Sequence, residues 1–156
     1  MRVDIDGACE IARLATTPNW NWNNPDGLHQ LCDATGWEIV SKMPSKSADL
    51  RTTLHVGRPE ASMYGNPRKM NLISTCVTDV ADIDTPGLTE WITPIFEELR
   101  IALATVLGEH SRYEPGREAT AFWDRPNMTV GLSMTWRSIH LRLVRPDGFY
   151  GIDYRD

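Results

Sequence analysis

Histidine, cysteine and carboxylate side chains are the residues of this sequence that could carry out chemistry. His55 and His140 fall in segments predicted to be strands, on a sheet face turned away from the helices, where either imidazole could act as a general base. The alternative is that both are simply exposed. No Gly-x-Ser-x-Gly sequence occurs, no cysteine lies in a catalytic motif, and no glycine-rich loop is suited to phosphate. The sequence therefore assembles no active site, and we expect no enzymatic activity.

Metal ligation requires histidine, cysteine or carboxylate side chains at set spacings. His29, Cys32 and Asp33 lie within one turn of a predicted helix, but that helix turns Cys32 toward the core and Asp33 toward solvent. Residues 79–84 are rich in aspartate but lack the glycine and the distal glutamate of a calcium-binding loop. We therefore predict neither a metal site nor a cofactor.

The cysteines also indicate the compartment. Cys9, Cys32 and Cys76 are widely separated, form no Cys-x-x-Cys pair and lie in apolar segments, so we expect buried, reduced thiols. The first residues carry acids where a signal peptide has its apolar segment. No apolar run approaches the roughly 20 residues of a membrane-spanning helix. These features predict a cytoplasmic protein that does not bind membranes.

The charge of the chain is negative and unevenly distributed. Its 156 residues include 16 Lys or Arg and 21 Asp or Glu, a net charge of −5. This balance argues against a nucleic-acid-binding protein, because phosphate contacts need a cationic surface. Residues 1–78 hold 8 acids and 8 bases, whereas residues 79–156 hold 13 acids and 8 bases, so the second segment carries the whole excess. Residues 79–98 contain six acids and no Lys or Arg.

This acidic stretch is the main candidate for a partner-binding surface. A run of charges is most often a solvated face, but it can also attract a basic partner and speed its encounter. A second candidate is a pair of tryptophans in an Asn-rich loop, because aromatic side chains anchor interfaces. At least one of the two is expected to pack against the core instead. The predicted partner-binding residues are Asp79, Asp82, Asp84, Glu90, Glu97, Trp20 and Trp22.

Two helices are predicted near the N-terminus to position these residues. Asp4 or Asp6 can cap the first helix, which runs to about residue 15 with one apolar face. Asn24 is expected to cap the second helix, with Pro25 at its first position. Gly36 ends that helix, because glycine readily adopts a left-handed conformation.

The strongest helical pattern covers residues 88–107. Apolar side chains recur there every three or four residues until Gly108. Pro94 lies inside this window. Either a short turn precedes a helix capped by Thr93, or a single helix kinks at the proline.

Alternating apolar and polar residues predict six strands, at residues 37–42, about 52–56, 70–78, 119–124, 128–136 and 139–144. The turn at residues 64–67 is expected to join the second and third of these as a hairpin. Short connections favour antiparallel pairing, and the helices can cover only one face. We therefore predict one α+β domain over residues 1–156. Its open face should be wetter, lined by Thr53, His55, Thr129, Ser133, Thr135, His140 and Arg142.

Spaced aromatic and glycine residues carry a resemblance to a known family. The marks are Trp20-x-Trp22, Gly36-Trp37, the acids near Asp79, the helix end Leu107-Gly108-Glu109 and the strand end Phe122-Trp123. Over residues 8–145 this order resembles a family of small actinobacterial proteins, domain of unknown function 6301. The chain departs from the pattern at Asp124, where an arginine is expected, and in its Asn-rich loop. The resemblance implies no catalytic residues.

Small acidic α+β proteins of this kind are similar to immunity proteins, which neutralise a toxin domain by binding it. The expected function is thus an immunity protein that occludes the active site of a basic cognate toxin. An alternative is a secretion chaperone or adaptor, which holds an exported protein without inhibiting it. A small enzyme would need a pocket with converging polar groups near His55 and His140. The sequence leaves the toxin and the oligomeric state open.

Overall fold

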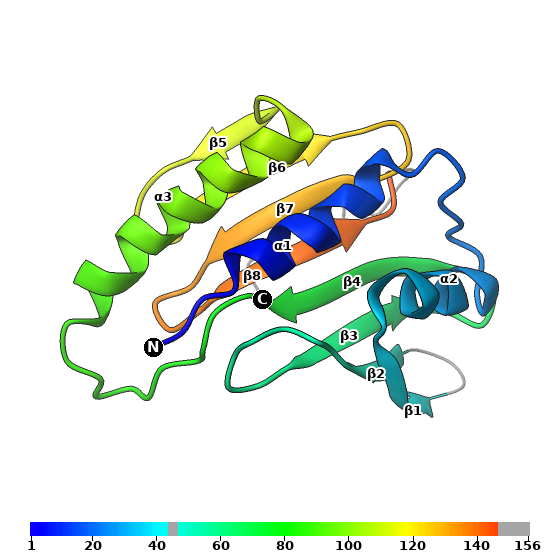
Figure 1. Cartoon of the computed structure of the whole chain (residues 1–156), viewed down its shortest axis with the longest axis horizontal. Coiled ribbons are helices and arrows are strands. Elements are labelled where there is room, and N and C mark those ends of the chain that lie inside the picture. The colour runs from blue at the N-terminus through cyan, green and yellow to red at the C-terminus, as the bar shows by residue number, and fades with distance from the viewer. Residues whose placement is uncertain (44–46, 147–156) are drawn as a thin grey trace.

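The computed structural model describes residues 1–43 and 47–146, which form three α-helices and one antiparallel sheet of eight strands (Figure 1). The predicted α+β class is confirmed, with eight strands in place of about six. The helices are α1 (Ile5–Ala12), α2 (Asp26–Thr35) and α3 (Leu88–Leu107), and a 3-10 helix, η1 (Arg13–Thr16), follows α1. The strands are β1 (Glu38–Met43), β2 (Ser47–Arg51), β3 (Glu60–Gly65), β4 (Met70–Cys76), β5 (Arg112–Glu114), β6 (Thr120–Asp124), β7 (Thr129–Met134) and β8 (Ile139–Val144).

The sheet consists of two meanders of four strands. Its order is β1-β2-β3-β4-β8-β7-β6-β5, so each strand pairs with its neighbour in sequence except where β4 meets β8. Helices precede each meander in the chain. Figure 1 shows α1 and α3 side by side across one face of the sheet, where they pack against each other. The last strand, β8, therefore lies in the middle of the sheet and joins the two meanders.

Local sequence signals explain the start of α1 and the end of α2, but not the start of α2. The Asp4 side chain accepts a hydrogen bond from the Gly7 N–H at 2.8 Å, which confirms Asp4 as the cap of α1. The predicted Asn24 cap of α2 is wrong. The Asn24 side chain instead donates to the Asn66 carbonyl at 2.9 Å, and α2 begins after Pro25 with no side-chain cap. Gly36 ends α2 as predicted, in the left-handed conformation at φ 77°.

The α3 helix is continuous from Leu88 to Leu107 and passes through Pro94. A helix start capped by Thr93 is therefore wrong. Pro94 is exposed, whereas the buried side chains form a stripe on the other side of the helix, so its ring faces solvent. The stripe consists of Leu88, Ile92, Phe96, Leu99, Leu103 and Leu107.

The segment predicted as a second strand, residues 52–56, is a loop between β2 and β3. Its alternating burial is real, since Leu54 and Val56 are buried and His55 is exposed. The Thr52 N–H still donates to the Pro59 carbonyl, but beyond it the N–H groups bond to side chains rather than to a neighbouring strand: the His55 N–H donates to Asp4 and the Gly57 N–H to Asp79. The alternating burial therefore arises from a loop whose apolar side chains pack into the core. β2, β3 and the three-residue edge strand β5 were not predicted.

The sheet face opposite the helices is less wet than predicted. Ser133 and Arg142 are buried, at 5% and 3% exposure. They lie on β7 and β8, which have neighbours on both sides, and large side chains cover this region. For example, a Cβ atom at Gly131 would lie 3.1 Å from the Phe122 ring. Half-buried side chains on this part of the molecule are Thr129, Thr135 and His140, whereas Thr53 and His55 belong to the 52–59 loop.

Candidate functional site

Asp79, the first acid of the predicted surface, is bound within the fold. Its carboxylate accepts the backbone N–H of Arg2 at 2.8 Å and that of Gly57 at 2.6 Å, and it pairs with the Arg2 guanidinium at 3.5 Å. Partial burial acts to raise the pKa of Asp79, but these donors outweigh it and hold the pKa below its ordinary value. Asp79 thus ties the N-terminus and the 52–59 loop together.

Glu97 has a similar internal role at the other end of the stretch. It forms an ion pair with Arg100 at 2.6 Å and accepts a hydrogen bond from the Tyr113 hydroxyl. The Arg100 guanidinium lies 4.7 Å from the centre of the Tyr113 ring. The hydrogen bond from Arg100 is the main reason that the pKa of Glu97 is lowered. Glu97 therefore joins α3 to β5.

The two tryptophans of the Asn-rich loop pack inward. Trp20 is buried and Trp22 is half-buried, and their rings meet edge to face with centroids 5.6 Å apart. The Trp22 indole N–H donates to the Asn127 carbonyl at 2.7 Å, a contact between residues 105 positions apart. This arrangement agrees with the expectation that at least one of the pair packs against the core.

The remaining acids of the stretch point outward. Asp82, Asp84 and Glu90 are exposed, and none forms an ion pair with another residue in the described ranges. Of the predicted acids, these three are the ones whose carboxylates are left for a partner.

Two exposed apolar side chains, which the sequence reasoning missed, lie at the same end of the sheet. Ile83 is 79% exposed, and Trp136, in the turn between β7 and β8, is 52% exposed. Figure 1 shows this turn and the 79–87 loop at the same end of the molecule. We call Asp82, Ile83, Asp84, Glu90 and Trp136 the acidic end. The signal for Ile83 was a lone apolar residue between two aspartates, and the signal for Trp136 was its place at the end of a predicted strand.

The acidic end is held in place by contacts between its two loops. The Ala81 N–H donates to the Arg137 carbonyl at 3.0 Å, and the Arg137 side chain donates to the Ala81 carbonyl at 2.6 Å. The Arg137 guanidinium also lies 5.4 Å from the centre of the Trp136 ring.

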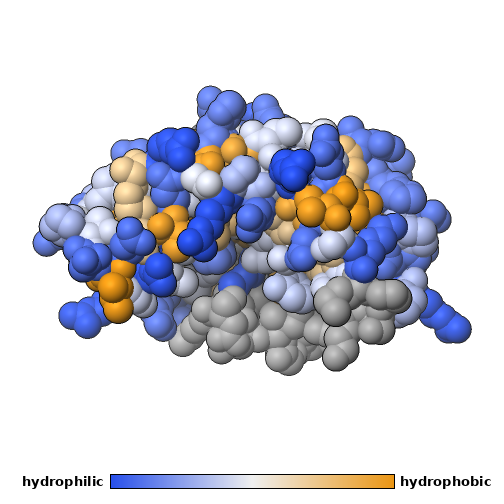
Figure 2. Space-filling view, turned by 90° about the horizontal axis from the view of Figure 1, so that it is seen from below, coloured by the Kyte–Doolittle hydropathy of each residue, from blue (hydrophilic) through white to orange (hydrophobic). Residues whose placement is uncertain are grey.

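On the side of the molecule drawn in Figure 2, apolar residues form separate small patches within a mainly hydrophilic surface.

A second polar group lies on the sheet face opposite the helices. Cys76 on β4 and His140 on β8 are directly paired across the sheet. The Cys76 sulfur lies 3.7 Å from His140 Nδ1 and 3.8 Å from Nε2, and the Ser138 hydroxyl lies 3.1 Å from Nε2. These residues line a pocket of about 360 Å³ together with Arg58, Glu60 and Tyr64, among others.

The chemistry of this group is that of neutral side chains. Burial, with a smaller contribution from Arg142, lowers the pKa of His140 to about 4, and burial raises the pKa of the Cys76 thiol. At neutral pH the imidazole is therefore uncharged and the thiol keeps its proton. Because the sulfur is almost equidistant from both ring nitrogens, it is aligned with neither lone pair. This geometry does not activate Cys76 as a nucleophile.

The other histidines and cysteines are dispersed. His55 lines a pocket beside α1, on the helix side of the sheet, so the predicted grouping of His55 with His140 on one face is wrong. His29 and Asp33 are exposed, and Cys9, Cys32 and Cys76 are free thiols. Among residues 1–43 and 47–146, no three His, Cys, Asp or Glu side chains gather as metal ligands do. In the same ranges no helix has the length and apolarity needed to span a membrane.

Comparison with known proteins identifies the family. The fold defines an α+β protein whose helices cover one face of an antiparallel sheet. Residues 6–145 match the model of a family described as a family of unknown function (DUF6301), and since this range is most of the chain, the protein belongs to that family. No curated protein and no solved structure matches the chain.

Proposed function

We propose that this protein binds a basic protein partner through the acidic end, in the manner of an immunity protein that occludes the active site of a cognate toxin domain. The observation that carries the proposal is the exposure of Ile83 and Trp136 beside carboxylates that have no internal partner. Apolar and aromatic side chains at the centre of an interface supply most of its binding energy. Surrounding acids would steer a basic partner toward them and exclude acidic proteins.

The rigidity of the acidic end supports the same proposal. The backbone and side-chain bonds between Ala81 and Arg137 fix both loops before a partner arrives. A preformed surface loses less conformational entropy on binding than a flexible one, so more of the contact energy appears as affinity.

The test is co-expression with the product of the neighbouring gene, followed by size-exclusion chromatography and an assay of toxicity. We expect a 1:1 complex and protection of the cell. Ile83→Asp and Trp136→Ala should each weaken the complex by tenfold or more, about the effect of losing an interface anchor. The matched control is Ile101→Asp, which changes an apolar side chain 57% exposed on α3. Equal affinities for all three variants would exclude the acidic end as the binding surface.

The toxicity assay distinguishes the two kinds of binding protein. If the complex forms while the partner keeps its toxic activity, the immunity role is contradicted and the secretion chaperone or adaptor is favoured.

Charge reversal tests the steering role of the acids separately. The triple variant Asp82→Lys, Asp84→Lys, Glu90→Lys should slow association and reduce its dependence on salt, because it removes the long-range attraction for a basic partner. Stopped-flow measurements at two salt concentrations give both quantities. An unchanged association rate would mean that these carboxylates take no part in the encounter.

A further inference from the structure

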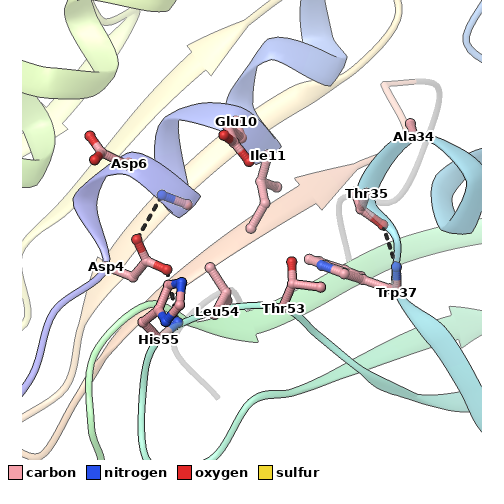
Figure 3. A pocket seen from close by; sticks show the side chains of 11 residues that line it. Asp4, Asp6, Glu10, Ile11, Ala34, Thr35, Trp37, Thr53, Leu54 and His55 are labelled. Carbon is pink, nitrogen blue, oxygen red and sulfur yellow. Dashed lines mark hydrogen bonds between the residues drawn. The ribbon is translucent and has the colours of Figure 1, made fainter.

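A pocket on the helix side of the sheet is separate from the acidic end. It has a volume of about 340 Å³ and lies between α1, the end of α2 and the 52–57 loop (Figure 3). None of the residues of the acidic end lines it. Its size is at the lower end of the range for ligand pockets, which suits a single side chain or a molecule of that size. The lining residues include Asp6, Glu10, Ile11, Trp37, Thr53 and Leu54.

The floor of the pocket is apolar and its rim is acidic. Ile11, Trp37 and Leu54 are buried residues of the main core. Asp6 and Glu10 are exposed, and because they are four residues apart on α1, they share one side of the helix. No cation among the described residues pairs with either of them.

Asp4, by contrast, belongs to the framework of the pocket. One of its carboxylate oxygens accepts the Gly7 N–H and the other accepts the His55 N–H, both at 2.8 Å (Figure 3). These bonds fix the start of α1 against the 52–57 loop. The positions of the Asp6 and Glu10 backbones are therefore set before any ligand enters.

An unpartnered donor also faces the pocket. Trp37 is 4% exposed, and Figure 3 shows its indole extending into the pocket toward Thr53 and Leu54. The backbone N–H of Trp37 donates to the Thr35 hydroxyl, but its indole N–H has no hydrogen-bond partner among the described residues. The indole nitrogen is not among the polar atoms closed off from solvent, so the N–H is open to the pocket. A ligand in the pocket can therefore supply its acceptor.

We propose that this pocket binds a basic side chain of another polypeptide. The apolar stem of an arginine or lysine would pack on Ile11, Leu54 and the Trp37 ring, and its cation would lie between Asp6 and Glu10. A carbonyl of the same polypeptide would accept the Trp37 indole N–H. Arginine fits best, since its planar guanidinium can bridge two carboxylates and stack on an aromatic ring. The site does not depend on the proposed function, because it can be tested on the isolated protein with a small compound.

The experiment is a titration of the ¹⁵N-labelled protein with Nα-acetyl-L-arginine methylamide, which carries a guanidinium and two amide carbonyls. The Trp37 indole signal is assigned by its loss in Trp37→Phe. We expect that signal to shift at millimolar concentrations of the compound. The double variant Asp6→Asn, Glu10→Gln should bind about fivefold more weakly, the effect of losing two exposed charge pairs. The matched control is Asp33→Asn, Glu98→Gln, which changes two exposed acids outside the pocket.

Two further compounds define the ligand. The neutral isostere Nα-acetyl-L-citrulline methylamide should bind more weakly, and equal binding would overturn the role of the cation. Free L-arginine should also bind more weakly than the capped compound, because its carboxylate meets an acidic rim. Tighter binding of free L-arginine would overturn the polypeptide source and identify a small-molecule site. No shift of the Trp37 signal with any of the three would overturn the proposal.

Discussion

The acids at the two ends of residues 79–98 and the acids between them have the same side-chain chemistry but opposite surroundings. Asp79 and Glu97 accept hydrogen bonds within the fold, from Arg2 and Gly57 in one case and from Arg100 and Tyr113 in the other. Asp82, Asp84 and Glu90 face solvent. A charge run in a sequence is therefore not one surface: its members divide according to the partners that the fold supplies.

The comparison extends to the other candidate residues. Trp22 and His140 have polar atoms satisfied inside the protein, like Asp79 and Glu97. Ile83 and Trp136 are exposed, like the outward acids. The first set should contribute mainly to folding and the second mainly to binding, and stability measurements can test this division.

The largest effect is expected from His140. Because its pKa in the folded protein is about 4 and its ordinary value is 6.5, the unfolded chain binds a proton between these pH values that the folded protein does not. Folding stability should therefore fall as the pH drops from 6.5 to 4, by up to about 3 kcal/mol. Urea unfolding across this range measures it. His140→Gln should lose this part of the pH dependence, whereas His55→Gln, at an exposed site, should keep it.

The next effect is that of Asp79. Asp79→Ala leaves the Arg2 and Gly57 N–H groups without their acceptor and should cost about 2 kcal/mol in the free energy of unfolding at pH 7. Asp82→Ala, three residues away and exposed, is the control and should change stability by less than about 0.5 kcal/mol. Similar costs for both variants, measured by urea unfolding, would remove the distinction between inward and outward acids.

Glu97 should have a smaller and pH-dependent effect. Glu97→Gln should cost about 1 kcal/mol at pH 7, because it weakens the links to Arg100 and Tyr113. The pKa of Glu97 is lowered in the folded protein, so this stabilisation is present above the ordinary value of 4.5 and is lost as the pH falls through the lowered one. Glu98→Gln, an exposed neighbour, should show neither the cost nor its pH dependence in the same measurement.

The smallest effect on stability is expected at the two exposed apolar residues. Ile83→Ala and Trp136→Ala should each change the free energy of unfolding by less than about 0.5 kcal/mol, because both are surface residues, 79% and 52% exposed, outside the buried core. A loss above about 1 kcal/mol in thermal or urea unfolding would place that residue with the internal set.

The parts of the fold that local pattern determines were predictable. The α3 helix was predicted with its bounds, and β6, β7 and β8 were predicted nearly so, because the apolar residues of each recur with the period of its own backbone. The failures are β2 and β3 of the first meander and β5 of the second. β3 contains small and polar residues with weak strand preference, whereas the neighbouring loop at residues 52–56 shows the alternation of a strand. β5 has three residues and depends on its pairing with β6.

The position of the candidate site could be predicted from the sequence. Which of its acids bind within the fold and which face solvent could not. The charge count located the acids, but the bond from the Arg2 backbone to Asp79 joins residues 77 positions apart, and no local pattern contains it. The contact between Ala81 and Arg137, which brings Ile83 and Trp136 to one end, spans 56 positions. Such pairings arise from the order of strands in the sheet, which short-range periodicity does not specify.

The central place of β8 bears on how a cell makes this protein. The ribosome releases β4 well before β8. One edge of β4 therefore stays unpaired while α3 and β5–β7 are synthesised. When β7 emerges, it has an uncovered edge as well. Open strand edges pair readily with other chains, so the unfinished polypeptide is the form most prone to aggregate. Release of β8 would close both edges at once, so the two meanders would become one sheet only after this strand is made.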